Sequence, residues 1–239
     1  MCIHRRQGSL LREVNLERVR SAGSVVVLRG ADKHLAKAVK PGQFVMMRGW
    51  DRYDPLLPRP FSVMDVQGEW VYFLVKGVGP GSTMLQRGGK VYISEPLGNG
   101  FTVDEKSRVV VVGGGSGIAG VFLLTRVLPK GNLYWGVRQE DYVHLEFPNE
   151  WKVEVVIEEQ EGLVTERVSK GDILYACGPE PMLRKLAQKR DMWGRVEFLI
   201  ERRMACGVGV CRGCVVEGRG GYLTVCKDGP VFSLEELGW

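Results

Sequence analysis

Residues 108–120 read RVVVVGGGSGIAG, a run of valines that passes directly into glycines and then into an apolar stretch. Consecutive β-branched residues are typical of a strand buried on both faces of a parallel sheet. Residues 118–127 then have the composition of a buried helix. Between strand and helix, Gly115, Gly117 and Gly120 fit the G-x-G-x-x-G pattern in the context that nucleotide binding requires. Such glycines let the backbone approach a phosphate at a helix N-terminus.

Alternating strands and helices continue downstream, which predicts a parallel sheet with right-handed crossovers. We expect strands at 132–137, 152–157, 172–176 and 196–200, and a helix at 181–189. No acidic residue closes the strand at 132–137, where Arg138 stands, so the usual ribose contact is unsupported. Cys177-Gly178-Pro179 is a second strand-to-helix turn at the edge where ligands bind in open α/β sheets. A simple tight turn is the alternative.

Upstream, the first hundred residues contain short apolar runs separated by glycine and proline turns. This pattern predicts a small closed antiparallel β-barrel. The expected strands cover residues 10–20, 24–29, 44–48, 61–66, 70–76 and 90–94, with a hairpin at Gln67-Gly68. A charged linker at 104–107 separates the barrel from the α/β part. We therefore expect domains at 1–103 and 104–200, and a glycine- and cysteine-rich segment at 201–239.

Two segments of the barrel region could hold phosphate. Arg59-Pro60-Phe61-Ser62 opens a strand, where an arginine can clamp a pyrophosphate and a serine can bond a ring nitrogen. A surface arginine before an edge strand is the alternative. Residues 76–83, KGVGPGST, form a glycine-rich loop before a short helix expected at 84–87. The loop offers free backbone amides for phosphate, although a flexible loop would have the same composition.

The sharpest signal is a cluster of cysteines near the C-terminus. Four of the six cysteines lie within 21 residues, at Cys206, Cys211, Cys214 and Cys226. The spacing C-x4-C-x2-C followed by one distant cysteine is that of plant-type 2Fe–2S proteins. The alternative is a structural zinc site, but zinc sites usually combine two C-x2-C knuckles and the second half here has a single cysteine. Cys2 and Cys177 lie outside the pattern.

Composition limits the remaining classes of function. The chain has 239 residues, 44% hydrophobic and 26% charged, as in a globular protein of one or two domains. Its mild excess of positive charge, +5, is spread along the chain, so we expect no nucleic-acid partner. No apolar run approaches the ~20 residues of a membrane span, and no secretory signal is seen. We therefore expect a cytoplasmic protein with no membrane partner.

Together these motifs resemble the ferredoxin–NADP reductase superfamily. Residues 59–62 look like its flavin motif, Gly81-Ser82 like its pyrophosphate loop, residues 96–98 (PLG) like its interdomain motif, and residues 177–179 like its nicotinamide motif. The C-terminal cysteines narrow the resemblance to electron-transfer subunits of NAD-dependent (type B) dihydroorotate dehydrogenases. Residues 97–101, 201–207 and 226–232 carry that match. The resemblance covers essentially the whole chain.

The resemblance implies a role for each part. FAD would be held by Arg59, Pro60, Phe61, Ser62, Leu74, Val75, Lys76, Gly81 and Ser82. Ser62, Cys177 and Gly178 would lie at the flavin–nicotinamide contact, and the cysteines at 206, 211, 214 and 226 would ligate the 2Fe–2S cluster. NAD would be the co-substrate. The family further implies an FMN-containing dihydroorotate dehydrogenase catalytic subunit as partner, in a heterotetramer of two plus two.

Departures from the family pattern leave other functions open. Glu95 stands where relatives usually have Gly before the PLG motif, and Ser82 replaces the usual threonine. Related subunits serve sulfhydrogenases and electron-bifurcating transhydrogenases, where the first cluster ligand is commonly aspartate. Cys206 at that position favours the dihydroorotate enzyme. From a different class, a non-enzymatic zinc-stabilised interaction module is a further alternative.

Overall fold

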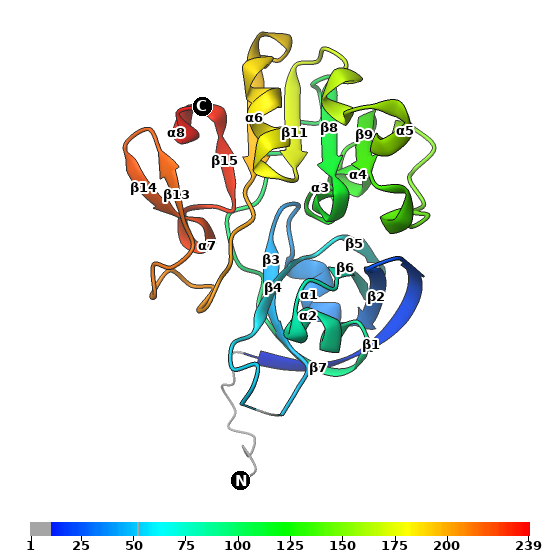
Figure 1. Cartoon of the computed structure of the whole chain (residues 1–239), viewed down its shortest axis with the longest axis vertical. Coiled ribbons are helices and arrows are strands. Elements are labelled where there is room, and N and C mark those ends of the chain that lie inside the picture. The colour runs from blue at the N-terminus through cyan, green and yellow to red at the C-terminus, as the bar shows by residue number, and fades with distance from the viewer. Residues whose placement is uncertain (1–10, 52) are drawn as a thin grey trace.

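The computed structural model describes residues 11–51 and 53–239. Seven strands form an antiparallel sheet in the order β4-β3-β7-β1-β2-β6-β5. This sheet is the lower, blue-to-cyan part of Figure 1, and it curls around its own apolar core. Its strands are β1 (Leu11–Ala22), β2 (Val25–Ala31), β3 (Phe44–Arg48), β4 (Arg59–Ser62), β5 (Asp65–Gln67), β6 (Trp70–Lys76) and β7 (Gly89–Ser94). Within the described residues the strand pairings leave β4 and β5 as open edges, so the expected closed barrel is a half-barrel.

The strand expected at 61–66 is in fact two strands. The β4 strand pairs with β3, whereas β5 pairs with β6 in the expected hairpin. The chain changes partner between them, because the Val63 amide bonds Gln43 O at 3.2 Å and the Met64 amide bonds Tyr72 O at 2.9 Å. At this point the chain passes from β4, at one edge of the curled sheet, to β5, at the other edge.

Two short helices lie on the half-barrel. Helix α1 (Lys33–Ala38) is capped by Asp32, whose carboxylate accepts the amides of His34 and Leu35. Helix α2 (Pro80–Leu85) begins four residues before the expected helix at 84–87 and ends at Leu85. Pro80 explains the early start, because proline suits the first helical turn, where its missing N–H costs nothing.

A six-stranded sheet forms the upper part of Figure 1, in the order β10-β9-β8-β11-β12-β15. The first five strands are parallel, as predicted, and β15 is antiparallel to β12. They are β8 (Val109–Gly114), β9 (Gly131–Val137), β10 (Trp151–Ile157), β11 (Ile173–Cys177), β12 (Arg195–Leu199) and β15 (Val231–Ser233). Val109 and Val111 pack into one core and Val110 and Val112 into the other, which explains the unbroken valine run.

Helices cover both faces of this sheet. The helix expected at 118–127 is two helices, α3 (Ile118–Val121) and α4 (Leu124–Val127). A tighter turn separates them, because the Thr125 amide bonds Phe122 O instead of the carbonyl four residues back. The others are α5 (Glu158–Glu161) and α6 (Glu180–Gln188), the latter near the helix expected at 181–189. None of the helices in the described residues combines the length and apolar character needed to cross a membrane.

The C-terminal residues form a hairpin of β13 (Val215–Gly218) and β14 (Gly221–Thr224), followed by α7 (Val225–Asp228) and α8 (Leu234–Leu237). The hairpin stands at the left of Figure 1, in orange. Cys214, Val216 and Cys226 share an apolar core with Leu174 of β11 and Leu183 of α6. The cysteine-rich segment is therefore packed on the α/β sheet and contributes its last strand.

Candidate functional site

The two phosphate-binding segments expected in the half-barrel lie side by side. A Cβ atom at Gly81, on α2, would be 2.9 Å from Arg59 Nε on β4 and 3.1 Å from the Trp50 ring. The Arg59 guanidinium lies 5.8 Å from the Trp50 ring centroid and donates to Leu57 O at 2.6 Å. The absence of a side chain at position 81 therefore lets the guanidinium lie directly against the start of the helix. A cradle of one cation and glycine backbone fits a pyrophosphate group.

The Ser82 hydroxyl shapes this loop from inside. It accepts the amides of Val78 and Gly79 at 3.0 and 3.1 Å, and it donates to Gly79 O at 3.0 Å. The serine side chain is thus occupied by its own loop. Outward, the loop presents the exposed Val78 side chain and bare backbone at Gly79, where a Cβ atom would meet nothing within 4 Å.

The strand-end residues expected to contact the flavin are placed differently from one another. The side chains of Leu74 and Val75 are buried, Leu74 toward the α/β sheet and Val75 in the half-barrel core. Lys76 Nζ lies 2.7 Å from Asp141 Oδ2, on the turn after β9. Only backbone atoms of Leu74 and Val75 are therefore available to a ligand, and the Lys76 ammonium is paired with the other sheet's domain.

The glycines of the G-x-G-x-x-G pattern serve two purposes. Gly115 has a positive φ of 54° and open space beside it, as a phosphate-facing turn requires. A Cβ atom at Gly117 would lie 2.8 Å from Gly178 Cα, and one at Gly120 would lie 2.9 Å from Cys177 Sγ. The second and third glycines therefore let helix α3 pack directly against the end of β11.

Cys177 and Gly178 lie at the carboxyl end of β11, as predicted. A Cβ atom at Gly178 would be 2.6 Å from Met182 Cε and 3.0 Å from Gly114 Cα, so the turn is closely packed. The Cys177 thiol lies 3.9 Å from Glu201 Oε1, just beyond β12. Burial, and then the nearby Glu201 carboxylate, raise the pKa of Cys177 well above its usual range. The residue is therefore a neutral thiol at neutral pH and not a nucleophile.

The four C-terminal cysteines lie as two pairs, Cys206 with Cys211 and Cys214 with Cys226. Backbone amides of Val208 and Cys211 point at Cys206 Sγ, both at 3.5 Å, and the Gly209 amide lies 3.1 Å from Cys226 Sγ. The Cys226 amide lies 3.4 Å from Cys214 Sγ. Positive φ angles at Gly207 (72°) and Gly209 (82°) wrap the loop around these sulfurs.

These sulfurs differ in their tendency to ionise. The amides of Cys211 and Val208 lower the pKa of Cys206 to about 6. Burial, and then the adjacent Cys214 thiol, raise the pKa of Cys226 to about 12. Within residues 11–51 and 53–239 no three His, Cys, Asp or Glu side chains are grouped as for a single metal ion. Two cysteine pairs wrapped by amides fit the donor set of a two-iron cluster, in which four thiolates are shared between two irons.

The cysteine loop lies against the half-barrel. A Cβ atom at Gly207 would be 2.6 Å from Met46 Cγ and 3.2 Å from Leu97 Cδ1. Met46 is on β3, directly opposite Pro60 of β4. The cluster loop and the strand of the flavin motif are therefore separated by a single strand. The Asn99 side chain fixes this contact by bonding the backbone of Val231 in both directions, at 2.8 and 3.1 Å.

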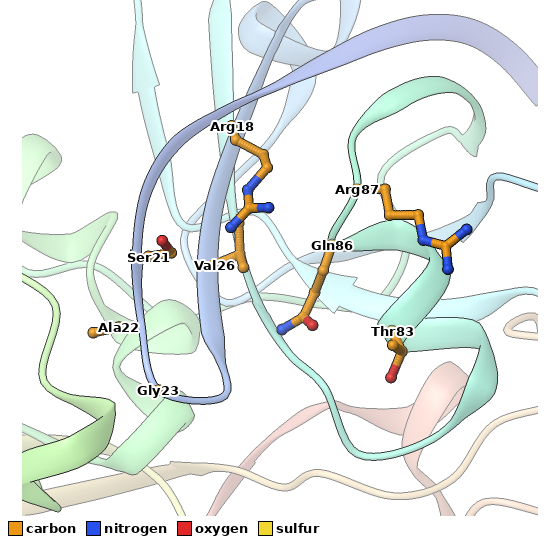
Figure 2. A pocket seen from close by; sticks show the side chains of 8 residues that line it. All are labelled: Arg18, Ser21, Ala22, Gly23, Val26, Thr83, Gln86 and Arg87. Carbon is orange, nitrogen blue, oxygen red and sulfur yellow. The ribbon is translucent and has the colours of Figure 1, made fainter.

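Figure 2 shows a cavity of about 380 Å³ between the β1–β2 hairpin and α2. In this view Gln86 lies between Arg18 and Arg87, and the Arg87 side chain extends away from the other two. The Gln86 amide donates to Ser24 O and Val75 O, which ties α2 to the sheet. None of the residues that the sequence predicted for a site lines this cavity.

Met46 carried no signal in the sequence analysis, and Asn99 and Glu201 entered it only within the matching segments 97–101 and 201–207, without a role of their own. Glu201, Met46 and Asn99 are brought to the cysteines and to β11 only by the packing of the two sheets. Glu95, which departs from the family pattern, accepts bonds from Arg12 and His34, away from the PLG turn that precedes Asn99. Asp141, which follows a strand end where a ribose contact is common, is instead bonded to the half-barrel.

Comparison with known proteins agrees with this geometry. The model of the iron-sulfur cluster binding domain of dihydroorotate dehydrogenase B matches residues 201–238. The chain is 38% identical to the dihydroorotate dehydrogenase B (NAD(+)) electron transfer subunit of Caldanaerobacter subterraneus, over 84% of this chain and 88% of that protein. It is 34% identical to an electron transfer subunit homolog from Aquifex aeolicus, over 95% of this chain and 99% of that protein.

Solved structures show the same architecture. The NADH-dependent reduced ferredoxin-NADP oxidoreductase, studied for flavin-based electron bifurcation, superposes with a TM-score of 0.82 at 26% identity, covering 94% of this chain and 88% of that one. The ferredoxin reductase of carbazole 1,9a-dioxygenase shares the fold, with a TM-score of 0.59 at 16% identity over 77% of this chain and 68% of that one. The sequence identities and their coverage settle the matter: this chain belongs to the family of dihydroorotate dehydrogenase B electron transfer subunits.

Proposed function

We propose that this chain carries electrons from the FMN of a dihydroorotate dehydrogenase catalytic subunit to NAD, in pyrimidine biosynthesis. The observation that carries the proposal is the placement of Gly207 of the cysteine loop against Met46, on the strand that pairs with the Arg59–Ser62 strand. These contacts would bring a two-iron donor set, a pyrophosphate cradle and a nucleotide fold together in one chain. When bound, FAD couples the two-electron chemistry of NAD to the one-electron chemistry of a 2Fe–2S cluster.

Each group would be held by residues already described. Arg59 and the backbone at Gly79–Gly81 would hold the FAD pyrophosphate. Pro60, Phe61 and Ser62 would line the flavin, together with the backbone of residues 74–76. Gly115 would face the NAD phosphates, with Gly117 and Gly120 bringing helix α3 against β11. The four cysteines would ligate the cluster.

Residues of this chain would shape the place where the nicotinamide ring meets the flavin for hydride transfer. Gly178 presents backbone without a side chain, so a nicotinamide ring could lie against it. Cys177 stays neutral, since burial raises its pKa, and so it adds no charge beside the ring. Ser62 supplies a hydroxyl that could bond a flavin ring nitrogen.

The proposal includes a partner and a location. An FMN-containing catalytic subunit would supply the dihydroorotate site, in an assembly of two plus two chains. A cytoplasmic location and the division of the chain at residues 103 and 200 stay predictions.

A second function deserves comparison because of the similarity to the NADH-dependent reduced ferredoxin-NADP oxidoreductase. The same cofactors could serve a sulfhydrogenase or an electron-bifurcating transhydrogenase. Cysteine at position 206, in place of aspartate, supports the dihydroorotate partner. Mixing the purified chain with the FMN-containing catalytic subunit distinguishes these functions, and metal analysis of the same protein tests the alternative of a zinc-stabilised interaction module.

In the experiment, the chain is purified anaerobically and assayed alone and with the FMN-containing catalytic subunit. We expect NADH to reduce the flavin of the isolated chain, no dihydroorotate oxidation alone, and dihydroorotate-dependent NAD reduction by the complex. A complex that transfers no electrons to NAD would contradict the proposal. Zinc in place of iron in a colourless protein would favour the interaction module.

A further inference from the structure

Two buried carboxylates lie at the contact between the half-barrel and the α/β domain. Asp65 belongs to β5 and Asp141 to the turn after β9, and their side chains are 4% and 8% exposed. Each is paired with a cation of the other domain. Arg126 Nε and Nη2 lie 2.9 and 2.8 Å from the two Asp65 oxygens, and Lys76 Nζ lies 2.7 Å from Asp141 Oδ2. The exchange is reciprocal: each domain supplies one carboxylate and one cation.

The backbone around Asp141 is shaped for this contact. Besides Lys76, its carboxylate accepts the amide and the hydroxyl of Ser24, at 3.1 and 2.8 Å, so all three bonds come from the half-barrel. The preceding residue, Gly23, has a positive φ of 50°, and a Cβ atom there would overlap the Glu140 carbonyl. The β1–β2 turn can therefore pack against the Glu140–Asp141 segment only with glycine at position 23.

The Asp65 carboxylate is also held by hydrogen bonds from neighbouring residues. Its oxygens accept the Val66 amide and the Gln67 side-chain amide, both at 2.8 Å, which fixes the carboxylate toward Arg126. Arg126 also donates to Glu146 O at 3.2 Å. The Arg126 guanidinium is thus oriented by Glu146 of its own domain, and its Nε and Nη2 atoms bond Asp65 of the half-barrel.

The surface between the two ion pairs is apolar. Val25, Val27, Met64 and Leu74 of the half-barrel share one core with Ile118 and Phe122. Apolar contact favours association but has no direction, so several orientations could bury similar area. A shifted orientation would leave a buried carboxylate without its cation, which is strongly unfavourable. The charged pairs therefore select one orientation.

We propose that Asp65 and Asp141 are positioning residues that fix the α/β domain in one orientation on the half-barrel. They would thereby set the distance between the nicotinamide at Gly178 and the flavin at Ser62. This inference rests on the proposed function, in which NADH reduces the bound flavin. NADH would bind to the α/β domain alone, so loss of the two residues should lower the rate of flavin reduction and leave NADH affinity nearly unchanged.

The test uses the full chain loaded with FAD and iron. Asp65→Asn, Asp141→Asn and the double variant are mixed with NADH in a stopped-flow spectrometer. We expect the limiting rate of flavin reduction to fall about tenfold or more in the double variant, because small misplacements of reacting groups have large effects on rate. The NADH concentration at half-saturation should change far less than the rate, because NADH would bind to the α/β domain alone. An unchanged limiting rate would overturn the inference.

Controls separate orientation from general instability. Glu13→Gln breaks a carboxylate–lysine pair within the half-barrel, 3.0 Å long, and should leave the rate unchanged. The swap of Asp65→Arg with Arg126→Asp should restore part of the rate lost in Asp65→Asn. Small-angle scattering should show a wider distribution of domain orientations in the double variant.

The scattering measurement also separates the two proposals. If NADH fails to reduce the wild-type flavin, the proposed function is contradicted, and scattering still tests the fixed orientation. If wild-type reduction is normal and the double variant scatters as the wild type does, the positioning role is wrong.

Discussion

The cysteine loop and the proposed flavin–nicotinamide contact are built in opposite ways. The four cysteines lie within 21 residues, and amides of the same loop and of α7 point at their sulfurs. The flavin–nicotinamide contact that we propose would combine Ser62 of β4 with Cys177 and Gly178 at the end of β11, from two different sheets, and Glu201, beyond β12, lies beside Cys177. We therefore expect a single cysteine substitution in the loop to remove the cluster completely. Substitutions at the contact assembled from two sheets should instead lower rates or affinities by degrees.

The largest effect is expected from Cys211→Ser. Loss of one of four thiolates should abolish the cluster, so iron should fall from about two atoms per chain to near zero. The flavin should stay bound, because Arg59 and Gly81 lie on other elements. Iron analysis and the visible spectrum of anaerobically purified protein measure this. Zinc at full occupancy in wild-type protein would refute the two-iron reading.

Cys214→Ser tests the role of the cluster in the complex with the catalytic subunit. The coupled transfer from dihydroorotate to NAD should be lost, whereas NADH should still reduce the flavin of the variant. Rapid-mixing spectra follow the two reactions separately. Coupled transfer at the wild-type rate would mean that the cluster does not connect the two flavins.

Gly178→Val should block reduction of the flavin by NADH while flavin and iron remain bound. The new side chain would press on Met182 Cε and Gly114 Cα, 2.6 and 3.0 Å from the Cβ position, and so would displace the turn that we propose faces the nicotinamide. Stopped-flow reduction measures the effect. Gly220→Val is the matched control, because a Cβ atom there would meet nothing within 4 Å. Combining Gly178→Ala with Met182→Ala removes the contact with Met182, although the Cβ atom would still lie 3.0 Å from Gly114 Cα. Full NADH reduction in Gly178→Val would exclude Gly178 from the contact.

Arg59→Ala should weaken FAD binding by about 1.5–3 kcal/mol, the usual loss when a hydrogen bond to a charged group is removed. Titration of apoprotein with FAD measures the dissociation constant. Arg167→Ala, which removes an exposed arginine 4.0 Å from Glu154, should leave FAD affinity as it is. Equal affinities of the two variants would remove Arg59 from the FAD site.

The smallest effect concerns pH. Burial favours the neutral form of Asp141, but the bonds from Lys76 and Ser24 outweigh it and lower the pKa. A carboxyl with a lowered folded-state pKa stabilises the fold above its unfolded pKa of about 3.9 and loses this contribution as pH falls through the folded value. The free energy of unfolding of wild type should therefore exceed that of Asp141→Asn at pH 7, and the gap should narrow below about pH 4. A gap constant from pH 7 to pH 3 in denaturant titrations would contradict this.

Much of this protein was predictable because its signals are local. The valine run, the glycine turn and the cysteine spacing each depend on neighbouring residues, so they indicated the parallel sheet, the nucleotide fold and the cluster. The same local reasoning joined β4 and β5 into one strand, because alternating apolar residues do not reveal a change of partner. It also predicted a continuous helix at 118–127, where the structure has two.

The amino-acid sequence by itself determined the strand–glycine–helix pattern and the cysteine spacing, and from these it predicted which residues would hold iron, phosphate and nicotinamide, because such roles depend on side-chain type and spacing along the chain. Only the tertiary structure decided that Met46 lies under the cysteine loop, that Glu201 faces Cys177, and that Asp141 bonds Lys76 and Ser24 in place of a ribose. These contacts join residues more than 20 positions apart, and burial decides which of the available polar partners meet. A buried carboxylate must find a cation or a donor, and only the packing of the two sheets determines which one is within reach.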